Sequence, residues 1–119
     1  MKITLHYIPP NWNEYIKKER TNYYIANRLK QQEKEIVRYE TIGQRYKGKY
    51  PVELIIKAHF KDKRMDIDNV RIKGAVDGLV SSGVIENDNL THIQKLTIIP
   101  VFDNQEITEI EIKKILQNK

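Results

Sequence analysis

The segment KRMDIDNVRIKGAVDGLVSSGVIENDN, at residues 63–89, organises the rest of the chain. Asp66 and Asp68 stand one residue apart near its start. A short apolar helix pattern follows, which carries Lys73 and leads through a turn to Asp88. Three carboxylates around one short helix repel one another unless a cation offsets their charge, and hard cations such as Mg²⁺ prefer oxygen ligands. The segment therefore favours the hypothesis of a metal-dependent nuclease site.

The regions beside this segment predict an α+β fold. Apolar residues alternate over residues 52–60, which indicates a strand that delivers the first two aspartates at its end. Helical spacing over residues 69–82 predicts a helix, and Gly83 suits the left-handed position that ends one. Residues 92–101 and 106–115 predict two strands that form a hairpin.

The first third of the chain predicts one strand and one long helix. Residues 2–8 alternate as a half-buried strand does, and Pro9-Pro10 ends it. Residues 12–41 contain no glycine or proline and carry a thin apolar stripe, which predicts a helix with one edge on a sheet. The predicted order is strand, helix, strand, helix, strand, strand, as a small mixed sheet with helices packed on it. We expect a single domain over residues 1–119.

Composition limits the classes of protein that fit this sequence. The chain has 21 Lys and Arg against 16 Asp and Glu, a net charge of +5, and a basic protein of this size often binds a polyanion. Charge alone describes a solvated surface equally well. The absence of cysteine excludes disulfides and thiolate zinc sites. We see no signal peptide and no run of the roughly 18–20 apolar residues that a membrane span needs, so we expect a soluble, cytoplasmic protein.

The acidic pair also has simpler explanations. An aspartate before a helix caps free N–H groups and suits the helix dipole, but one cap needs only one such residue. A calcium loop of the EF-hand type that started at Asp66 would have Val70 and Arg71 at its fifth and sixth places, so that pattern fails. Lys73 and Asp77 are four residues apart, and an exposed pair of this kind contributes only about 0.3–0.5 kcal/mol. Lys73 is then either an ordinary surface residue or a group that faces the carboxylates.

The loop at residues 43–51 interleaves Arg45, Lys47 and Lys49 with two tyrosines. These residues could contact DNA phosphates while the tyrosines stack. We favour the alternative, in which the loop is a solvated connector and its tyrosines cover the core. The three histidines, His6, His59 and His92, are not at metal-pair spacing and are interpreted as ordinary strand residues, with His92 kept as a residue that supports Asp88.

The pattern around the aspartates resembles that of the RusA family of Holliday-junction resolvases. The resemblance lies between residues 66 and 88, and beyond them it depends only on chain size and element order. Its positions are Asp66, Asp68, Asn69, Lys73, Asp77, Leu79, Gly83 and Asp88.

The resemblance implies a RusA-like fold and a Mg²⁺-dependent endonuclease, with Mn²⁺ as a substitute metal. It implies a homodimer that resolves branched DNA, the four-way junction, in recombination and repair. The metal ligands it implies are Asp66, Asp68 and Asp88. The catalytic lysine is Lys73, and Asn69 supports the acids. Basic residues near this segment are candidate DNA contacts, together with those of the loop: Arg45, Lys47, Lys49, Lys63, Arg64 and Arg71.

Two positions depart from the family pattern. Lys73 stands five positions after Asp68, where the family often shows four. One extra helical residue turns a side chain by roughly 100°, so an insertion inside the helix would make Arg71 the candidate, whereas an insertion before it would keep Lys73. Asn87 stands where the family often has an aspartate, which leaves Asp88 as the ligand and Glu86 as a weaker substitute. The rival hypotheses are a non-catalytic DNA-binding module with the same fold and an unrelated small metal-binding regulator.

Overall fold

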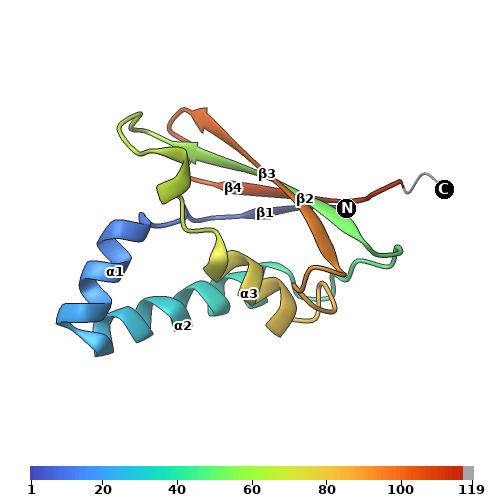
Figure 1. Ribbon diagram of the computed structural model, residues 1–119, viewed down its shortest axis with the longest axis horizontal. Helices are drawn as coiled ribbons and strands as arrows, with labels where there is room; N and C mark the ends of the chain where they lie inside the picture. Colours follow the sequence, from blue (N-terminus) through green and yellow to red (C-terminus); the bar gives the residue numbers. More distant parts are fainter. Residues whose placement is uncertain (117–119) are drawn as a thin grey trace.

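Four strands form one mixed sheet in the order β1-β4-β2-β3, in a computed structural model that describes residues 1–116 (Figure 1). Central β2 runs antiparallel to β4 and parallel to β3, and β1 pairs antiparallel with the far side of β4. The three α-helices lie on one face of this sheet, so the predicted α+β class is confirmed (Figure 1). The strands are β1 (Lys2–Leu5), β2 (Val52–Phe60), β3 (Ile93–Phe102) and β4 (Thr108–Lys114).

The predicted hairpin between the last two strands is wrong. β2 lies between β3 and β4 and pairs with both, so the chain crosses β2 as it passes from β3 to β4. The parallel pair explains the difference, because parallel strands need a crossover connection and α3 (Lys73–Ser81) supplies one between β2 and β3. β3 then occupies one side of β2, and only the other side remains for β4.

The predicted long helix is also wrong, because it is two helices, α1 (Trp12–Thr21) and α2 (Tyr23–Glu40). Asn22 separates them with a non-helical backbone, at φ −152° and ψ 89°. Its N–H donates to the Lys18 carbonyl at 2.7 Å, and its side-chain oxygen accepts from the N–H of Ile25 at 3.3 Å. Asparagine favours such cap positions, which is why one residue ends α1 and begins α2 without a glycine or proline. The observed element order therefore has one helix more than predicted.

Three other predicted elements are shorter in the structure, among them the last strand, predicted over residues 106–115 and observed as Thr108–Lys114. β1 ends at Leu5 instead of residue 8, since the N–H of His6 donates to the Glu40 side chain at 2.7 Å instead of to a strand. The helix predicted from residue 69 begins at Lys73. Ahead of it, Ile67–Asn69 form a single 3-10 turn, η1. Gly83 does end this region in the left-handed conformation, at φ +79°, as predicted.

The core fills the space between the sheet and the helices. Its largest members come from every strand but β3 and from α2, α3 and the residues after α3: Leu5, Val37, Leu54, Ile56, Leu79, Val84, Ile85, Ile110 and Ile112. α2 and α3 pack closely because α3 presents two glycines to α2. A Cβ at Gly78 would lie 2.7 Å from the Val37 Cβ, and a Cβ at Gly74 would overlap the Glu33 carboxylate. Among the described residues no helix is long and apolar enough to cross a membrane.

Candidate functional site

Three of the six aspartates in the chain carry carboxylates without a partner. Within residues 1–116, Asp66, Asp68 and Asp88 are exposed and their carboxylates make no hydrogen bond or ion pair. The other three are all paired, in the couples Asp62–Arg64, Asp77–Lys73 and Asp103–His59. The unpaired carboxylates are therefore those that the sequence predicts as metal ligands. Unpaired, exposed oxygen donors fit the coordination chemistry of Mg²⁺.

The side chains of these aspartates do not form one group in this structure. Asp66 precedes η1 and Asp68 lies within it, whereas Asp88 stands in the loop between α3 and β3. Nowhere in residues 1–116 do three or more His, Asp or Glu side chains gather as metal ligands would. Asp88 shares a pocket with Lys73, and neither Asp66 nor Asp68 lines it. The metal site at these three residues stays a prediction.

Lys73 is the first residue of α3 and is 56% exposed. Its Nζ lies 3.3 Å from the Asp77 carboxylate, one helical turn away, which is the weak surface pair that the sequence offered as one of two alternatives. Lys73, Asp77 and Asp88 line one pocket of about 400 Å³ between α3 and the start of β3. The ammonium of Lys73 is thus held only weakly by Asp77, and the unpaired carboxylate of Asp88 lines the same pocket.

All residues between Asp68 and Lys73 lie ahead of α3. Asn69 belongs to η1, Val70 forms an isolated bridge with Asn11, and the N–H of Arg71 donates to the Pro10 carbonyl at 2.9 Å. The spacing of five residues is therefore accommodated in a non-helical segment that is fastened to the start of α1. This is the arrangement that keeps Lys73, and not Arg71, at the helix start.

Arg71 is not available to DNA, because its side chain is only 1% exposed. It forms a buried ion pair with Glu33 of α2, and its guanidinium lies 4.0 Å from the ring centre of Tyr15 and 5.2 Å from that of Trp12. A guanidinium suits this place because it is planar, weakly hydrated and able to stack on aromatic rings. We therefore remove Arg71 from the predicted DNA contacts and from the candidates for catalysis.

Glu33 is the acid that sequence reasoning missed. It lies among charged and amide residues of a long helix, and nothing in that pattern distinguishes it from a solvated side chain. Burial raises the pKa of Glu33, and the charge of Arg71 and its hydrogen bond act in the opposite direction. The Tyr7 hydroxyl donates to Glu33 at 3.3 Å, and burial followed by this acid raises the pKa of that phenol. The buried group thus joins the segment after β1, α2 and the segment ahead of α3.

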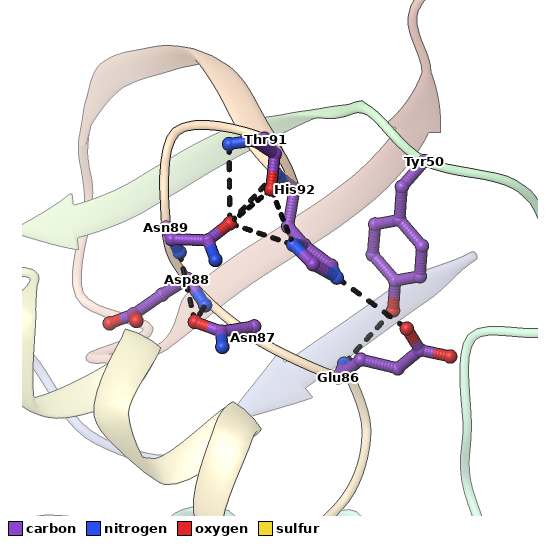
Figure 2. A network of polar contacts seen from close by, with 7 residues as sticks. All are labelled: Tyr50, Glu86, Asn87, Asp88, Asn89, Thr91 and His92. Carbon is purple, nitrogen blue, oxygen red and sulfur yellow. Dashed lines mark hydrogen bonds and ion pairs between the residues drawn. The ribbon is translucent and has the colours of Figure 1, made fainter.

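The loop that carries Asp88 is held by its own side chains (Figure 2). The Asn87 side-chain oxygen accepts from the N–H groups of Asp88 at 2.7 Å and Asn89 at 3.1 Å. The Asn89 oxygen accepts in turn from Thr91 and His92. Asn87 therefore shapes the loop, which an amide oxygen does without adding a negative charge beside Asp88.

Glu86 and Asp88 point in different directions from this loop (Figure 2). Glu86 lies 3.5 Å from His92, its N–H donates to the Tyr50 hydroxyl at 3.0 Å, and the Tyr50 and His92 rings are 4.8 Å apart. Asp88 points away from this group. His92 thus helps to hold the loop that carries Asp88, through its contacts with Asn89 and Glu86, while its predicted support of the Asp88 side chain stays a prediction.

The loop at residues 43–51 agrees with the favoured alternative. Tyr46 and Tyr50 pack edge to face at 5.4 Å and against the core, and the Tyr46 N–H donates to the Val84 carbonyl at 2.8 Å. The five remaining candidate DNA contacts are exposed: Arg45, Lys47, Lys49, Lys63 and Arg64. Arg64 pairs with Asp62, and the Lys63 ammonium lies 5.4 Å from the Phe102 ring centre.

His59 is buried on β2 between two acids that the sequence did not connect with it. Its Nδ1 lies 2.8 Å from Asp103 and its Nε2 lies 2.7 Å from Glu109. Burial lowers the pKa of His59, but the hydrogen bonds and charges of the two acids raise it by more, so it lies above its usual value. His59 thus fastens the connection between β3 and β4, and both ring nitrogens are engaged.

No protein-family model matches this chain, and no curated protein matches it either. The resemblance to the RusA family therefore continues to depend on residues 66–88 alone.

Proposed function

We propose that the protein is a Mg²⁺-dependent endonuclease that hydrolyses phosphodiester bonds at DNA junctions. The observation that carries this proposal is the pairing pattern of the aspartates. Carboxylates that serve the fold have partners, as Asp62, Asp77 and Asp103 do, whereas the three in the family-like pattern are left exposed and unpaired. Exposed acids without a structural role are available to a cation and a phosphate.

Asp66, Asp68 and Asp88 would hold the ion, with Mn²⁺ as a substitute, and Asn69 supports them. When bound, the metal supplies an activated water and neutralises charge on the phosphate. Lys73 leaves its surface pair with Asp77 and stabilises the negative charge that develops on the phosphate during hydrolysis. The exposed basic side chains near residues 45–49 and 63–64 bind neighbouring phosphates.

In this proposal the fold is RusA-like and two copies act together in the cytoplasm. A two-fold dimer presents two equivalent sites, which suits the two symmetric strands of a four-way junction. Paired cuts on opposite strands would resolve the junction during DNA recombination and repair.

The rival proposal is a DNA-binding module without catalysis. Asn87 favours it, because a residue that the family often uses as an acid is here engaged with the backbone of its own loop. The two proposals share the exposed basic side chains and differ in the role of the aspartates.

A synthetic four-way junction with labelled strands tests the proposal. The wild-type chain should cut two opposite strands in Mg²⁺ and none in EDTA, and Asp68→Asn should bind the junction without cutting it. The matched control is Asp62→Asn, a nearby exposed aspartate that is paired with Arg64 and should leave cleavage intact. Binding should weaken steeply with salt, because phosphate contacts release counterions.

Each other outcome has a definite meaning. Tight binding without cleavage by the wild-type chain, in Mg²⁺ and in Mn²⁺, supports the rival. Loss of binding together with cleavage in Asp68→Asn shows that Asp68 is structural. Binding that is insensitive to salt removes DNA from both proposals.

A further inference from the structure

The pocket that holds Lys73 and Asp88 is larger and more apolar than phosphate chemistry needs. Its volume of about 400 Å³ lies within the roughly 300–1,000 Å³ typical of small-molecule sites. The wall between the charged residues is formed by Trp12, Ile72 and Val76 on the helical side and by Leu90, Ile93 and Leu96 on the other. Such a wall suits a flat, largely apolar group.

The charges at the pocket leave little attraction for an anion inside it. Lys73 is paired with Asp77 at 3.3 Å, and Lys95 lies 3.6 Å from Glu53. Asp88 adds an unpaired negative charge at the same wall. The occupant that fits is uncharged and aromatic, while a phosphate attached to it stays at the rim beside Lys73.

Trp12 provides a fixed aromatic surface in this wall. Its ring packs edge to face with Tyr15, at 6.1 Å and 86°, and lies 5.2 Å from the buried Arg71 guanidinium. These contacts hold the indole while leaving it partly exposed in the pocket. Opposite, Leu90 is 83% exposed and Leu96 47%, so the apolar surface continues to the rim without cover from the described chain.

We propose that this pocket binds one unpaired nucleobase of the DNA strand whose phosphate lies at Lys73, an inference that rests on the proposed function. Every base has a face that can stack on an indole, and such stacking contributes about 1–3 kcal/mol per base. Taking a base out of its stack costs least where it is already poorly paired, as at the crossover of a junction. The pocket would thereby set the position of the cut relative to the crossover.

A thermodynamic cycle between the protein and the DNA tests this inference in EDTA, where no cleavage occurs. Junction binding is measured by fluorescence anisotropy for wild type and Trp12→Leu, on an intact junction and on junctions with one abasic site at each position near the crossover. At one position the abasic site should weaken wild-type binding about 5- to 150-fold, the equivalent of one stacked base. Trp12→Leu should weaken binding to the intact junction similarly, and both changes together should weaken it no further.

Two further variants serve as a second test and as a control. Leu90→Ala removes an exposed part of the same wall without touching the core, and it should show the same coupling to the same abasic position, with a smaller loss. Tyr24→Leu removes an aromatic side chain that is 85% exposed on α2, outside the pocket, and it should show no coupling. If Trp12→Leu fails to fold, the Leu90 cycle decides.

Independent losses for protein and DNA changes overturn the inference, as does equal coupling in Tyr24→Leu. If wild type binds and cuts the junction without any coupling, the base pocket fails and the proposed function stands. If wild type binds no junction, the proposed function fails first. Dissociation of a dimer by Leu90→Ala, seen by analytical ultracentrifugation, would assign the pocket to a second copy of the chain instead.

Discussion

Two ion pairs that begin only two residues apart differ in almost every physical respect. Arg71 pairs with Glu33 inside the protein, with side-chain exposures of 1% and 7%, whereas Lys73 pairs with Asp77 at the surface, with exposures of 56% and 31%. The first joins distant parts of the chain, 38 residues apart, and the second spans one helical turn. Formal charge is the same in both, so their surroundings decide what each pair does.

The difference shows how one short segment places a residue that stabilises the fold beside a residue that is proposed to act in catalysis. The segment ahead of α3 is fastened to Asn11 and Pro10, which turns Arg71 inward between Trp12 and Tyr15. Two residues later the helix has begun and Lys73 faces the pocket. Burial fixes the position of the arginine, and exposure leaves the lysine free to exchange partners.

The largest expected effect is on stability, and it should be much larger for the buried pair than for the exposed one. Arg71→Met leaves the Glu33 carboxylate buried without its cation and should lower the free energy of unfolding by about 3–5 kcal/mol. Lys73→Met should change it by less than about 0.5 kcal/mol, because its pair is exposed. Urea unfolding followed by circular dichroism measures both.

The double variant Arg71→Met/Glu33→Leu sharpens this result. It removes both charges, so it should recover a substantial part of the stability lost in Arg71→Met alone. Equal, small losses in Arg71→Met and Lys73→Met would contradict the buried pair.

The next effect is on the rate of cleavage. Here Lys73, whose loss hardly affects stability, should have the large effect. Lys73→Ala should slow single-turnover cleavage by about 100-fold or more, the scale of losing one donor to the charge of the transition state, while unfolding stays unchanged. Lys113→Ala, an exposed lysine on β4, is the control and should cut normally. Full activity in Lys73→Ala would remove the lysine from the proposed chemistry.

The smallest effect concerns His59, a buried side chain like Arg71, but one whose charge depends on pH. Its pKa is raised in the folded chain from 6.5, so protonation stabilises the fold fully below about pH 6.5, and this contribution is lost as the pH rises through the raised pKa. The N–H of Gln105, followed by His59, lowers the pKa of Asp103, so its contribution is present above about pH 3.8 and is lost as the pH falls through the lowered pKa.

Thermal unfolding from pH 5 to 9 should therefore show a decline in stability on the alkaline side for wild type. His59→Gln should flatten that decline. His6→Gln is the matched control, because His6 also meets one acid, Glu40, but with 72% of its side chain exposed. An alkaline decline that persists unchanged in His59→Gln would assign it to other groups.

Sequence patterns predicted which residues face the core better than they predicted which strands meet. Alternation over residues 52–60 correctly gave β2, because a period of two records burial on one face. Strand order depends on hydrogen bonds along the edges, which side-chain alternation does not record, so the hairpin prediction failed. Asn22 shows a similar limit, since one cap residue in a strongly helical sequence was enough to divide the helix.

For the candidate site, residue types could be predicted from the sequence, but their surroundings could not. The pair of Lys73 with Asp77 followed from helical spacing, which left open whether Lys73 is a surface residue or faces the other carboxylates. The burial of Arg71 depends on Glu33, Trp12 and Tyr15, all far away along the chain, and no local pattern contains that information. Whether Asp66, Asp68 and Asp88 act together depends on a third partner, the metal, which cleavage assays can test.

The glycine next to Lys73 has a consequence for how this protein can diverge. Any side chain at position 74 would overlap the carboxylate of Glu33, and a smaller residue at position 33 would leave Arg71 without its partner. Positions 33, 71 and 74 should therefore change together or not at all. Distant relatives can then be sought by this three-position combination beside the three aspartates, even where overall similarity is too low for a match.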